Sequence, residues 1–310
     1  ACGACPSCRQ LAAETHPDFQ VITKELARYH DNPNVRGRAM QQLGIDVIRQ
    51  FLIAPAHRAP ARGRGKVFVV REAELMSQAA QNALLKTLEE PPAGVILVLL
   101  CERTEQMLPT TRSRCATIRF GPLPRAFVTE KLTAAGEDPA EAAFWAAFTD
   151  GSVGRSLRRS AEELYGLKRQ IVDRLGSLPA AGDADLGEEW AKAMDARATA
   201  DVKAQKQQAA EDISPSKMLA SRRAAAVMLR MIAAAYRDAL LLRTGADAEL
   251  TNADQRAAVA ALAGRFEPSE LAQVLMDLSR YEQLLWRNVN PKAVWDNVVI
   301  SCASGAPARV

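Results

Sequence analysis

Three cysteines with regular spacing, Cys2, Cys5 and Cys8, stand at the start of the sequence in the segment ACGACPSC. Thiolates two residues apart can share one ion, because a tight turn brings their sulfur atoms to the same side. Zinc takes four such ligands in a tetrahedron, so we expect a structural zinc site here. A redox-active or unligated cluster is the alternative interpretation.

The fourth zinc ligand has two candidates at this point. One is His16 in the motif THPD, the only nearby histidine, and the other is a cysteine upstream of Ala1. Pro17 restrains His16 to an extended backbone, in which the imidazole more readily caps its own turn than binds a metal.

A second polar motif, Arg71–Glu72, follows the apolar run KVFVV at residues 66–70. Nucleoside triphosphatases place Asp-Glu after such a strand, where the Asp holds Mg²⁺ and the Glu polarises the attacking water. Arg71 takes the Asp position here, and a guanidinium repels a cation. A lone Glu72 is more often a surface or helix-start residue, so we expect no ATP hydrolysis at this degenerate site.

Arginines form a third group of candidate residues. Arg112 and Arg114 flank Ser113 in LPTTRSRC, and Arg155 stands in DGSVGRSL. Arg112 and Arg114 are either solvated surface residues or include an arginine finger for a neighbour's γ-phosphate, and the spacing alone leaves both possibilities open. Arg155 is either a phosphate sensor or a solvated residue in a helix that Ser152 caps.

Two buried parallel strands are expected to position these residues, at 66–70 and at 95–100 (VILVLL). Neither run alternates strictly, which is typical of strands covered on both faces. A helix between them is expected to begin at the N-cap Ser77 and to end before Pro91, which makes a right-handed strand–helix–strand unit.

A helix with the sequence GIDVIRQFLIAP is expected to stop at Pro55. The stretch after it, HRAPARGRG at residues 57–65, reads as an exposed basic loop.

From Arg125 onward the sequence shows only helical periodicity. Residues 188–211, rich in Ala, Lys and Gln, are only weakly amphipathic and are expected to be a solvated helix or a linker. The expected domains are an α/β core at 1–122 that includes the zinc module at about 1–20, a small helical domain at 123–179, a helical linker or insertion at 180–216, and a helical C-terminal domain at 217–310.

Composition narrows the class of protein. The 310 residues are 48% hydrophobic and 25% charged, which is ordinary for a folded globular protein, and the net charge of +4 permits an anionic partner without demanding one. Sparse cysteines indicate a reducing compartment, and no apolar run is long enough to span a membrane. The sequence lacks an initiator Met and begins inside a motif, so we expect a fragment of a longer chain.

The order of the motifs resembles that of the clamp-loader subunits of bacterial DNA polymerase III, in the AAA+ clan, and within them the delta prime (stator) type. The matching segments are CGACPSC, THPDF, NALLKTLEEPP, SRC, DGSVGRSL and NVNPKAVWDN. The resemblance implies an AAA+ core, a helical lid and a C-terminal collar in a five-subunit complex that opens the sliding clamp. It also implies a cytoplasmic protein of the DNA polymerase III holoenzyme, a DNA-directed DNA polymerase.

The same resemblance implies partners. These are the gamma/tau motor subunits that bind ATP, the delta subunit, the sliding clamp and, through the complex, primed DNA, with no membrane involved. Whether this chain itself binds nucleotide is left open.

Roles for particular residues follow from the resemblance as well. The family's fourth zinc cysteine lies nine residues before the trio, which would place it upstream of Ala1 and make His16 a bystander. The family's Ser-Arg-Cys triplet matches Ser113, Arg114 and Cys115, so Arg114 is the expected finger acting in trans, exposed and without a strong internal partner, and Arg112 is the less favoured neighbour. The family's second sensor matches Arg155.

Two alternatives remain. The ATP-hydrolysing gamma/tau subunit of the same complex carries Asp-Glu where this chain has Arg71–Glu72, and usually a small polar sensor residue where this chain has Leu99, Leu100 and Cys101. A zinc-dependent nucleic-acid binding protein would need basic and aromatic residues interleaved near the cysteines, but aromatics are 5% of the chain. Both are disfavoured.

Overall fold

The computed structural model describes residues 2–36, 42–160, 164–208, 217–286 and 289–305. The chain forms two compact units, an α/β unit at Ala1–Phe120 and a helical unit at Gly121–Val310. Parts of all four expected domains lie outside the described residues: 1 and 37–41 of the α/β core, 161–163 of the small helical domain, 209–216 of the linker, and 287–288 and 306–310 of the C-terminal domain.

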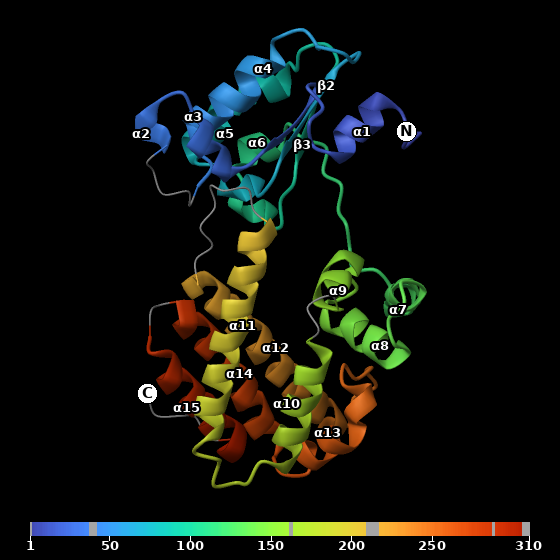
Figure 1. Ribbon diagram of the computed structural model, residues 1–310, viewed down its shortest axis with the longest axis vertical. Coiled ribbons are helices and arrows are strands. Elements are labelled where there is room, and N and C mark those ends of the chain that lie inside the picture. Colours follow the sequence, from blue (N-terminus) through green and yellow to red (C-terminus); the bar gives the residue numbers. More distant parts are fainter. Residues whose placement is uncertain (1, 37–41, 161–163, 209–216, 287–288, 306–310) are drawn as a thin grey trace. The chain divides into compact units, whose positions relative to one another are not determined.

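A parallel three-stranded sheet forms the centre of the α/β unit, in the order β1-β2-β3 (Figure 1). The strands are β1 (Phe19–Ile22), β2 (Lys66–Val70) and β3 (Val95–Leu99). Val70 of β2 is in register with Ile22 on one side and Leu99 on the other. The sequence prediction of parallel strands at 66–70 and 95–100 is therefore confirmed.

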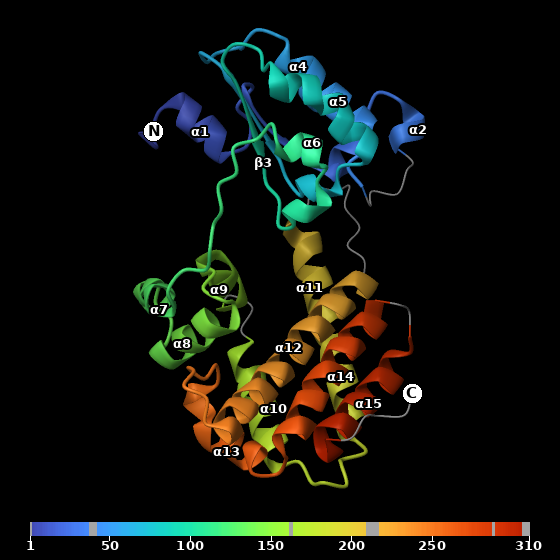
Figure 2. The same cartoon turned by 180° about the vertical axis from the view of Figure 1, so that it is seen from behind.

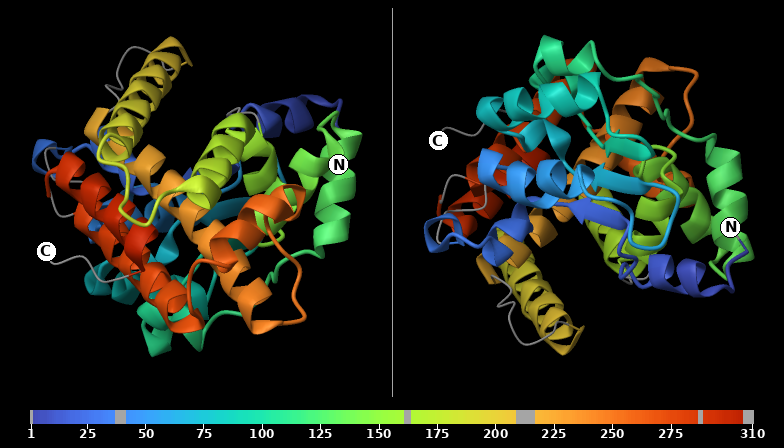
Figure 3. Two further views of the ribbon diagram at one scale, coloured as in Figure 1. Left: turned by 90° about the horizontal axis from the view of Figure 1, so that it is seen from below. Right: turned by 90° about the horizontal axis from the view of Figure 1, so that it is seen from above.

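Helices lie on both sides of this sheet. Figures 1 and 3 show α1 on the opposite side from α3 and α5. The helical segments are α1 (Pro6–Ala12), η1 (Lys24–Tyr29), α2 (Pro33–Arg36), α3 (Ile45–Ile48), the π-helical η2 (Arg49–Ile53), α4 (Ala54–Ala56), η3 (Ala73–Leu75), α5 (Gln78–Glu89), η4 (Thr104–Gln106) and α6 (Pro109–Arg112). The expected helix between the strands is α5, and its N-cap is Ser77, whose Oγ accepts the N–H of Ala80 at 3.2 Å.

The helix expected to stop at Pro55 continues through that residue to Ala56, so this prediction was wrong. A proline inside a helix lacks a donor and crowds the carbonyl one turn earlier. Here a π-helical turn precedes it, in which the N–H of Ala54 reaches five residues back to the carbonyl of Arg49. The wider turn gives the proline ring room, and the helix persists.

Strand β3 is not covered on both faces as its sequence predicted. Its side chains alternate, and Ile96 and Leu100 are 59% and 48% exposed. No element of the described chain pairs with the outer edge of β3. The apolar run therefore has one half-buried face, formed by Val95, Leu97 and Leu99, and one exposed face.

The second unit contains helices and no strands among its described residues (Figure 2). Its helices are α7 (Arg125–Ala134), α8 (Pro139–Phe148), α9 (Val153–Ser160), α10 (Tyr165–Ser177), α11 (Leu186–Gln208), α12 (Lys217–Thr244), η5 (Ala253–Gln255), α13 (Arg256–Ala263), α14 (Pro268–Trp286) and α15 (Pro291–Ser304). The all-helical prediction beyond Arg125 is confirmed. A single cluster of buried apolar side chains runs from Val128 to Ala303.

Helix α11 contributes to this core. Trp190, Met194 and Ala198 are buried at four-residue intervals, and the Trp190 ring packs edge-on against Trp295 of α15 at 5.9 Å between centroids. The first half of the Ala-rich segment is therefore packed rather than solvated on all sides. Its stripe is narrow and partly made of alanine, so the sequence shows only a weak apolar face.

An ion pair with a buried ammonium joins α10 to η5. The ammonium of Lys168 is fully buried and lies 2.6 Å from both carboxylate oxygens of Asp254. Tyr165 donates its hydroxyl to the same carboxylate at 2.9 Å, and the Phe144 ring lies 4.4 Å from the ammonium. Burial lowers the pKa of Lys168 although Asp254 opposes the shift. The pair is thus costly to desolvate and depends on both partners being present.

We predict that Lys168→Met lowers the free energy of unfolding by about 1–3 kcal/mol, because it leaves the partly accessible Asp254 carboxylate without its cation. Urea denaturation followed by circular dichroism measures this change. Lys192→Met is the matched control, since Lys192 forms an exposed pair with Glu188 and should leave the transition midpoint unchanged. Equal transitions for the two variants would contradict the prediction.

Candidate functional site

The three N-terminal cysteines converge at the start of α1. Cys5 caps this helix, its Sγ accepting the N–H of Cys8 at 3.5 Å, while the Cys5 N–H donates to Cys2 Sγ at 3.3 Å. All three sulfur atoms lie within 4.8 Å of one another. Zinc–sulfur bonds of about 2.3 Å in a tetrahedron place sulfur atoms about 3.8 Å apart. The trio is therefore close to the geometry that zinc requires.

Electrostatics also suit a metal at this cluster. Backbone N–H groups of Ala4 and Cys5 lower the pKa of the Cys2 thiol to about 7. The pKa of Cys8 is also lowered, chiefly by a hydrogen bond with the Cys5 side chain. Thiolate is the form that binds zinc, so the turn that gathers the sulfur atoms also favours their metal-binding state. The donor set fits three of zinc's four ligands.

His16 caps its own turn, as the sequence suggested. Its Nδ1 accepts the N–H of Asp18 at 3.1 Å. Among the described residues, the only group of three or more His, Cys, Asp or Glu residues arranged to hold a metal ion is the cysteine trio. The expectation that His16 is a bystander agrees with this arrangement.

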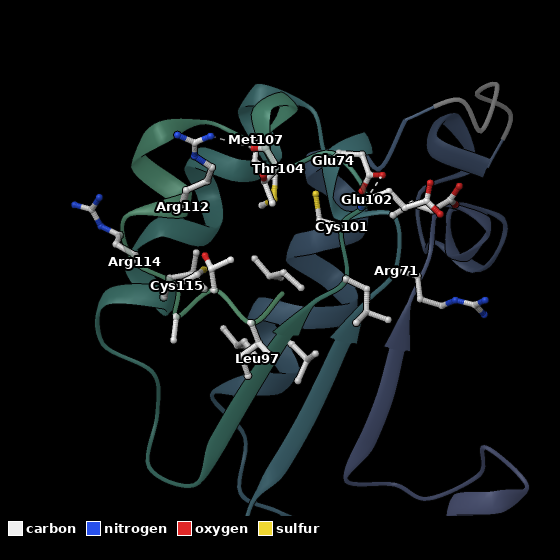
Figure 4. A pocket seen from close by; sticks show the side chains of 18 of the residues that line it. Arg71, Glu74, Leu97, Cys101, Glu102, Thr104, Met107, Arg112, Arg114 and Cys115 are labelled. Carbon is white, nitrogen blue, oxygen red and sulfur yellow. Dashed lines mark hydrogen bonds between the residues drawn. The ribbon is translucent and has the colours of Figure 1, made fainter. Parts of the chain in front are cut away.

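A groove of about 970 Å³ lies along β3 and the carboxyl end of β2. Its walls include residues 71–75 after β2, the strand β3, and residues 112–120 after α6 (Figure 4). Figure 4 shows Arg71 and Arg114 on opposite sides of this groove. The parallel topology thus brings the residues that follow both predicted strands to the carboxyl end of the sheet.

The Arg71–Glu72 pair forms the turn that leaves β2. The N–H of Arg71 donates to Ile22 in β1 at 3.0 Å. Glu72 has a left-handed backbone with φ of 51°, and its carboxylate pairs with Lys24 at 3.0 Å. A magnesium ion would meet one guanidinium and one carboxylate already occupied by an ammonium. This charge arrangement opposes cation binding.

The residues after β3 are equally unsuited to sensing a phosphate. Leu100 is exposed and Cys101 is half-buried. Burial, followed by the charge of Glu74, raises the pKa of the Cys101 thiol, so this group stays neutral. Among described residues at this end of β3, Glu102 donates its N–H to Glu74 at 3.3 Å, and no small polar side chain takes the place of Leu99 or Leu100.

Arg114 has a strong internal partner, contrary to the sequence expectation. Its Nε donates to Glu89 Oε1 at 2.5 Å, its Nη2 also contacts that carboxylate, and its Nη1 donates to the Thr110 carbonyl at 2.9 Å. Glu89 is the last residue of α5, twenty-five positions earlier in the chain. Nothing local in the sequence signals this contact, because it forms only when α5 and α6 pack together.

The neighbours of Arg114 are less constrained. Arg112 is exposed and makes one long contact, from Nη1 to the Thr104 carbonyl at 3.4 Å. Ser113 turns its hydroxyl to the Thr110 carbonyl at 3.1 Å, and Cys115 is half-buried, which raises its thiol pKa. The Ser-Arg-Cys triplet therefore presents one side chain, Arg114, in a fixed orientation at the surface.

Arg155 belongs to the helical unit. It stands in the first turn of α9, exposed, and its backbone N–H donates to Ser152 Oγ at 3.4 Å. Gly151 before this cap has φ of +73°, and an added Cβ would lie 2.2 Å from the Leu123 carbonyl. The capping role of Ser152 that the sequence offered is thus present, and Arg155 itself remains a surface residue.

Comparisons with known proteins point to one complex. Residues 1–124 match the family described as DNA polymerase III, delta subunit, and residues 198–299 match DNA polymerase III, delta subunit, C terminal. DNA polymerase III subunit delta′ of Escherichia coli is 29% identical over 92% of this chain and 72% of its own length. The delta′ subunit of Pseudomonas aeruginosa is 32% identical over 61% and 55%, respectively. These matches define a subunit of bacterial DNA polymerase III.

Which subunit it resembles follows from the extent of the matches. A gamma/tau subunit of Mycobacterium tuberculosis is 35% identical, but over only 40% of this chain and 19% of its own. The delta′ match from Escherichia coli extends over 92% of the chain and that from Pseudomonas aeruginosa over 61%, although the match from Yersinia pestis covers 37%. The chain belongs to the delta′ family of DNA polymerase III subunits. It spans from 30% of the Yersinia pestis relative to 72% of the Escherichia coli one, and so only part of the relatives' length.

We predict that the complete protein contains about one zinc ion per chain, bound by Cys2, Cys5 and Cys8 with a fourth ligand. Metal analysis by mass spectrometry should show that Cys5→Ser loses the zinc, since a closed structural site fails when one thiolate is removed. His16→Ala is the control and should keep it. If the zinc content of the Cys5→Ser variant were unchanged, the assignment of these cysteines as zinc ligands would be wrong.

Proposed function

We propose that this chain acts as the stator of a clamp loader, which helps to place the sliding clamp on primed DNA and supplies Arg114 in trans to a neighbouring ATPase. The observation that carries the proposal is the combination of two features on one unit. Arg114 is oriented at the surface, while Arg71 occupies the position where an active ATPase needs a magnesium ligand. The unit is arranged to assist hydrolysis elsewhere and not to perform it.

The donors of Arg114 support a role in trans. Of the five N–H groups of its guanidinium, three make the short contacts with Glu89 and Thr110. A fourth makes only a 3.5 Å contact, with Ser113 Oγ, and the fifth has no partner among the described residues. The outer edge of the planar fork is thus available to a phosphate, and Glu89 fixes the direction in which it points.

The domain roles belong to the same proposal. Residues 1–122 would be an AAA+ core with a structural zinc module, 123–179 its lid, 180–216 a linker or insertion, and 217–310 the collar that joins the other subunits. The gamma/tau motors, the delta subunit and the clamp would be its partners, in the cytoplasm. None of the helices in the described part of the chain is long and apolar enough to cross a bilayer. Arg155 would be the remnant of a second phosphate sensor.

We predict that the complete protein, purified alone, has no Mg²⁺-dependent ATPase activity, because Arg71 and the Lys24–Glu72 pair leave no carboxylate pair for the metal. A phosphate-release assay across Mg²⁺ concentrations measures this. Nucleotide binding is a separate property and is not tested by the assay. Mg²⁺-dependent ATP hydrolysis that is present in the unchanged protein and lost in the Glu72→Gln variant would contradict the prediction.

We predict that Arg114→Ala lowers clamp- and DNA-stimulated ATP hydrolysis by the reconstituted complex, by less than the full effect of about 10³-fold or more that one finger has at its own site. Other subunit interfaces would keep their own fingers, which limits the loss. Arg114→Lys should restore little, because an ammonium lacks the planar fork.

Arg112→Ala is the matched control, since Arg112 is an exposed arginine two residues away with one weak contact. The complex that contains this variant should hydrolyse ATP at the same rate as the unchanged complex. Size-exclusion chromatography should show intact assembly for all three variants. Normal hydrolysis by Arg114→Ala, or loss of assembly in place of rate, would return Arg114 to a structural role.

A further inference from the structure

A basic loop joins α4 to β2 and has no part in the function proposed above. This basic loop, residues 57–65, has the sequence HRAPARGRG, with three arginines and no acidic residue. Residues 57–64 are all exposed. Figure 1 shows it at the end of the sheet opposite to the residues that follow β2 and β3. Its arginines therefore form a site separate from the groove.

The centre of the basic loop is held by a buried carboxylate. Asp18, 5% exposed, accepts three successive backbone N–H groups, from Ala61 at 2.6 Å, Arg62 at 2.8 Å and Gly63 at 2.7 Å. Burial by itself would raise the pKa of Asp18, but these three bonds outweigh it and the pKa is lowered. The carboxylate is ionised at neutral pH and its hydrogen-bonding capacity is spent on the backbone.

Both ends of the loop are fixed as well. The Lys66 ammonium is buried and donates to the Pro55 carbonyl at 2.8 Å. Gly65 passes so close to Gly94 that an added Cβ would lie 2.1 Å from the Gly94 carbonyl. Only a glycine permits this approach. The arginines are therefore presented by a preorganised backbone, which lowers the entropic cost of binding a partner.

The guanidinium groups have little internal compensation. Arg62 donates to Gln10 in α1 at 3.2 Å, a neutral partner. No hydrogen bond or ion pair is found for Arg58 or Arg64 among the described residues. Three cationic side chains on eight residues of exposed loop thus face solvent, and none of their guanidinium groups is paired with a carboxylate in the described part of the chain. A surface with several unpaired positive charges attracts a polyanion.

We propose that the basic loop binds the phosphate backbone of duplex nucleic acid. Guanidinium forks match phosphate oxygens, and duplex DNA offers one charge per about 1.7 Å of its axis, so several phosphates face a loop of this length. The loop carries no Phe, Tyr or Trp on which a base could stack, and no exposed apolar residue larger than alanine or proline that could anchor a protein partner. Backbone contact without sequence preference is the mode that remains.

This inference stands on the loop's own chemistry and depends on neither the finger role of Arg114 nor the zinc site. The test compares the complete chain with a triple variant, Arg58→Ala/Arg62→Ala/Arg64→Ala, using the fluorescence anisotropy of a labelled primer–template duplex across a salt series. The expected result is an affinity at least about tenfold weaker at low salt, with a slope of log K against log salt that is shallower by about 2–3, since each phosphate contact contributes about 0.9.

Two further variants make the result decisive. Arg28→Ala/Arg256→Ala/Arg280→Ala removes the same charge from three exposed arginines elsewhere and should bind like the unchanged chain. Replacing the three loop arginines with lysine should keep the steep salt slope, because the charge remains, which separates loss of contact from loss of fold. Thermal unfolding by circular dichroism checks that each variant is folded.

The proposal fails if the loop and control triple variants weaken binding equally, or if the complete chain shows no binding to the duplex at low salt. It also fails if polyglutamate at equal charge binds the complete chain more tightly than the duplex does, since the loop would then be a site for an acidic protein segment. The ATPase measurements on Arg114 variants are unaffected by any of these outcomes, so the two proposals can fail separately.

Discussion

The pairing of β2 with a strand on each side is the constraint on which the α/β unit depends. At its carboxyl end, Arg71 donates to Ile22 of β1, and Leu100 donates to Val70 at 2.8 Å. At its amino end, Lys66 donates to Gly94 at 2.9 Å. These bonds fix the backbone at both ends of β2. The groove with Arg71 and Glu72 lies at the carboxyl end, and the basic loop lies at the amino end.

Helix α5 turns this register into a surface feature. Because α5 must return from the carboxyl end of β2 to the amino end of β3, its last residue, Glu89, lies at the far end of the crossover, where the chain after α6 passes back beside it. There it meets Arg114, whose guanidinium would otherwise sample many rotamers in solvent. A salt bridge that is partly exposed stabilises the fold little, because ordering the two side chains costs rotamer entropy, but it does orient the planar donor.

Carboxylates perform a related task in two other places. Asp18 collects three amide donors and so shapes the basic loop, while Asp254 neutralises the buried Lys168 beneath α8. Asp18 is buried and the Asp254 side chain is 13% accessible, and each carboxylate accepts hydrogen bonds from several donors, as a charge withdrawn from water requires. Both contacts join segments that are more than forty residues apart.

The sequence by itself determined the parallel strand–helix–strand unit, the Ser77 cap, the helical second unit, the cysteine trio and the exposed basic loop, because periodicity, capping and spacing are local properties. Tertiary structure alone decided that Glu89 holds Arg114, that β3 has an exposed face, that a π-turn carries the helix through Pro55, and that α11 packs its first half into the core. Each of these depends on which element lies next to another in space, and that neighbour is distant in the chain or lacks a local signal.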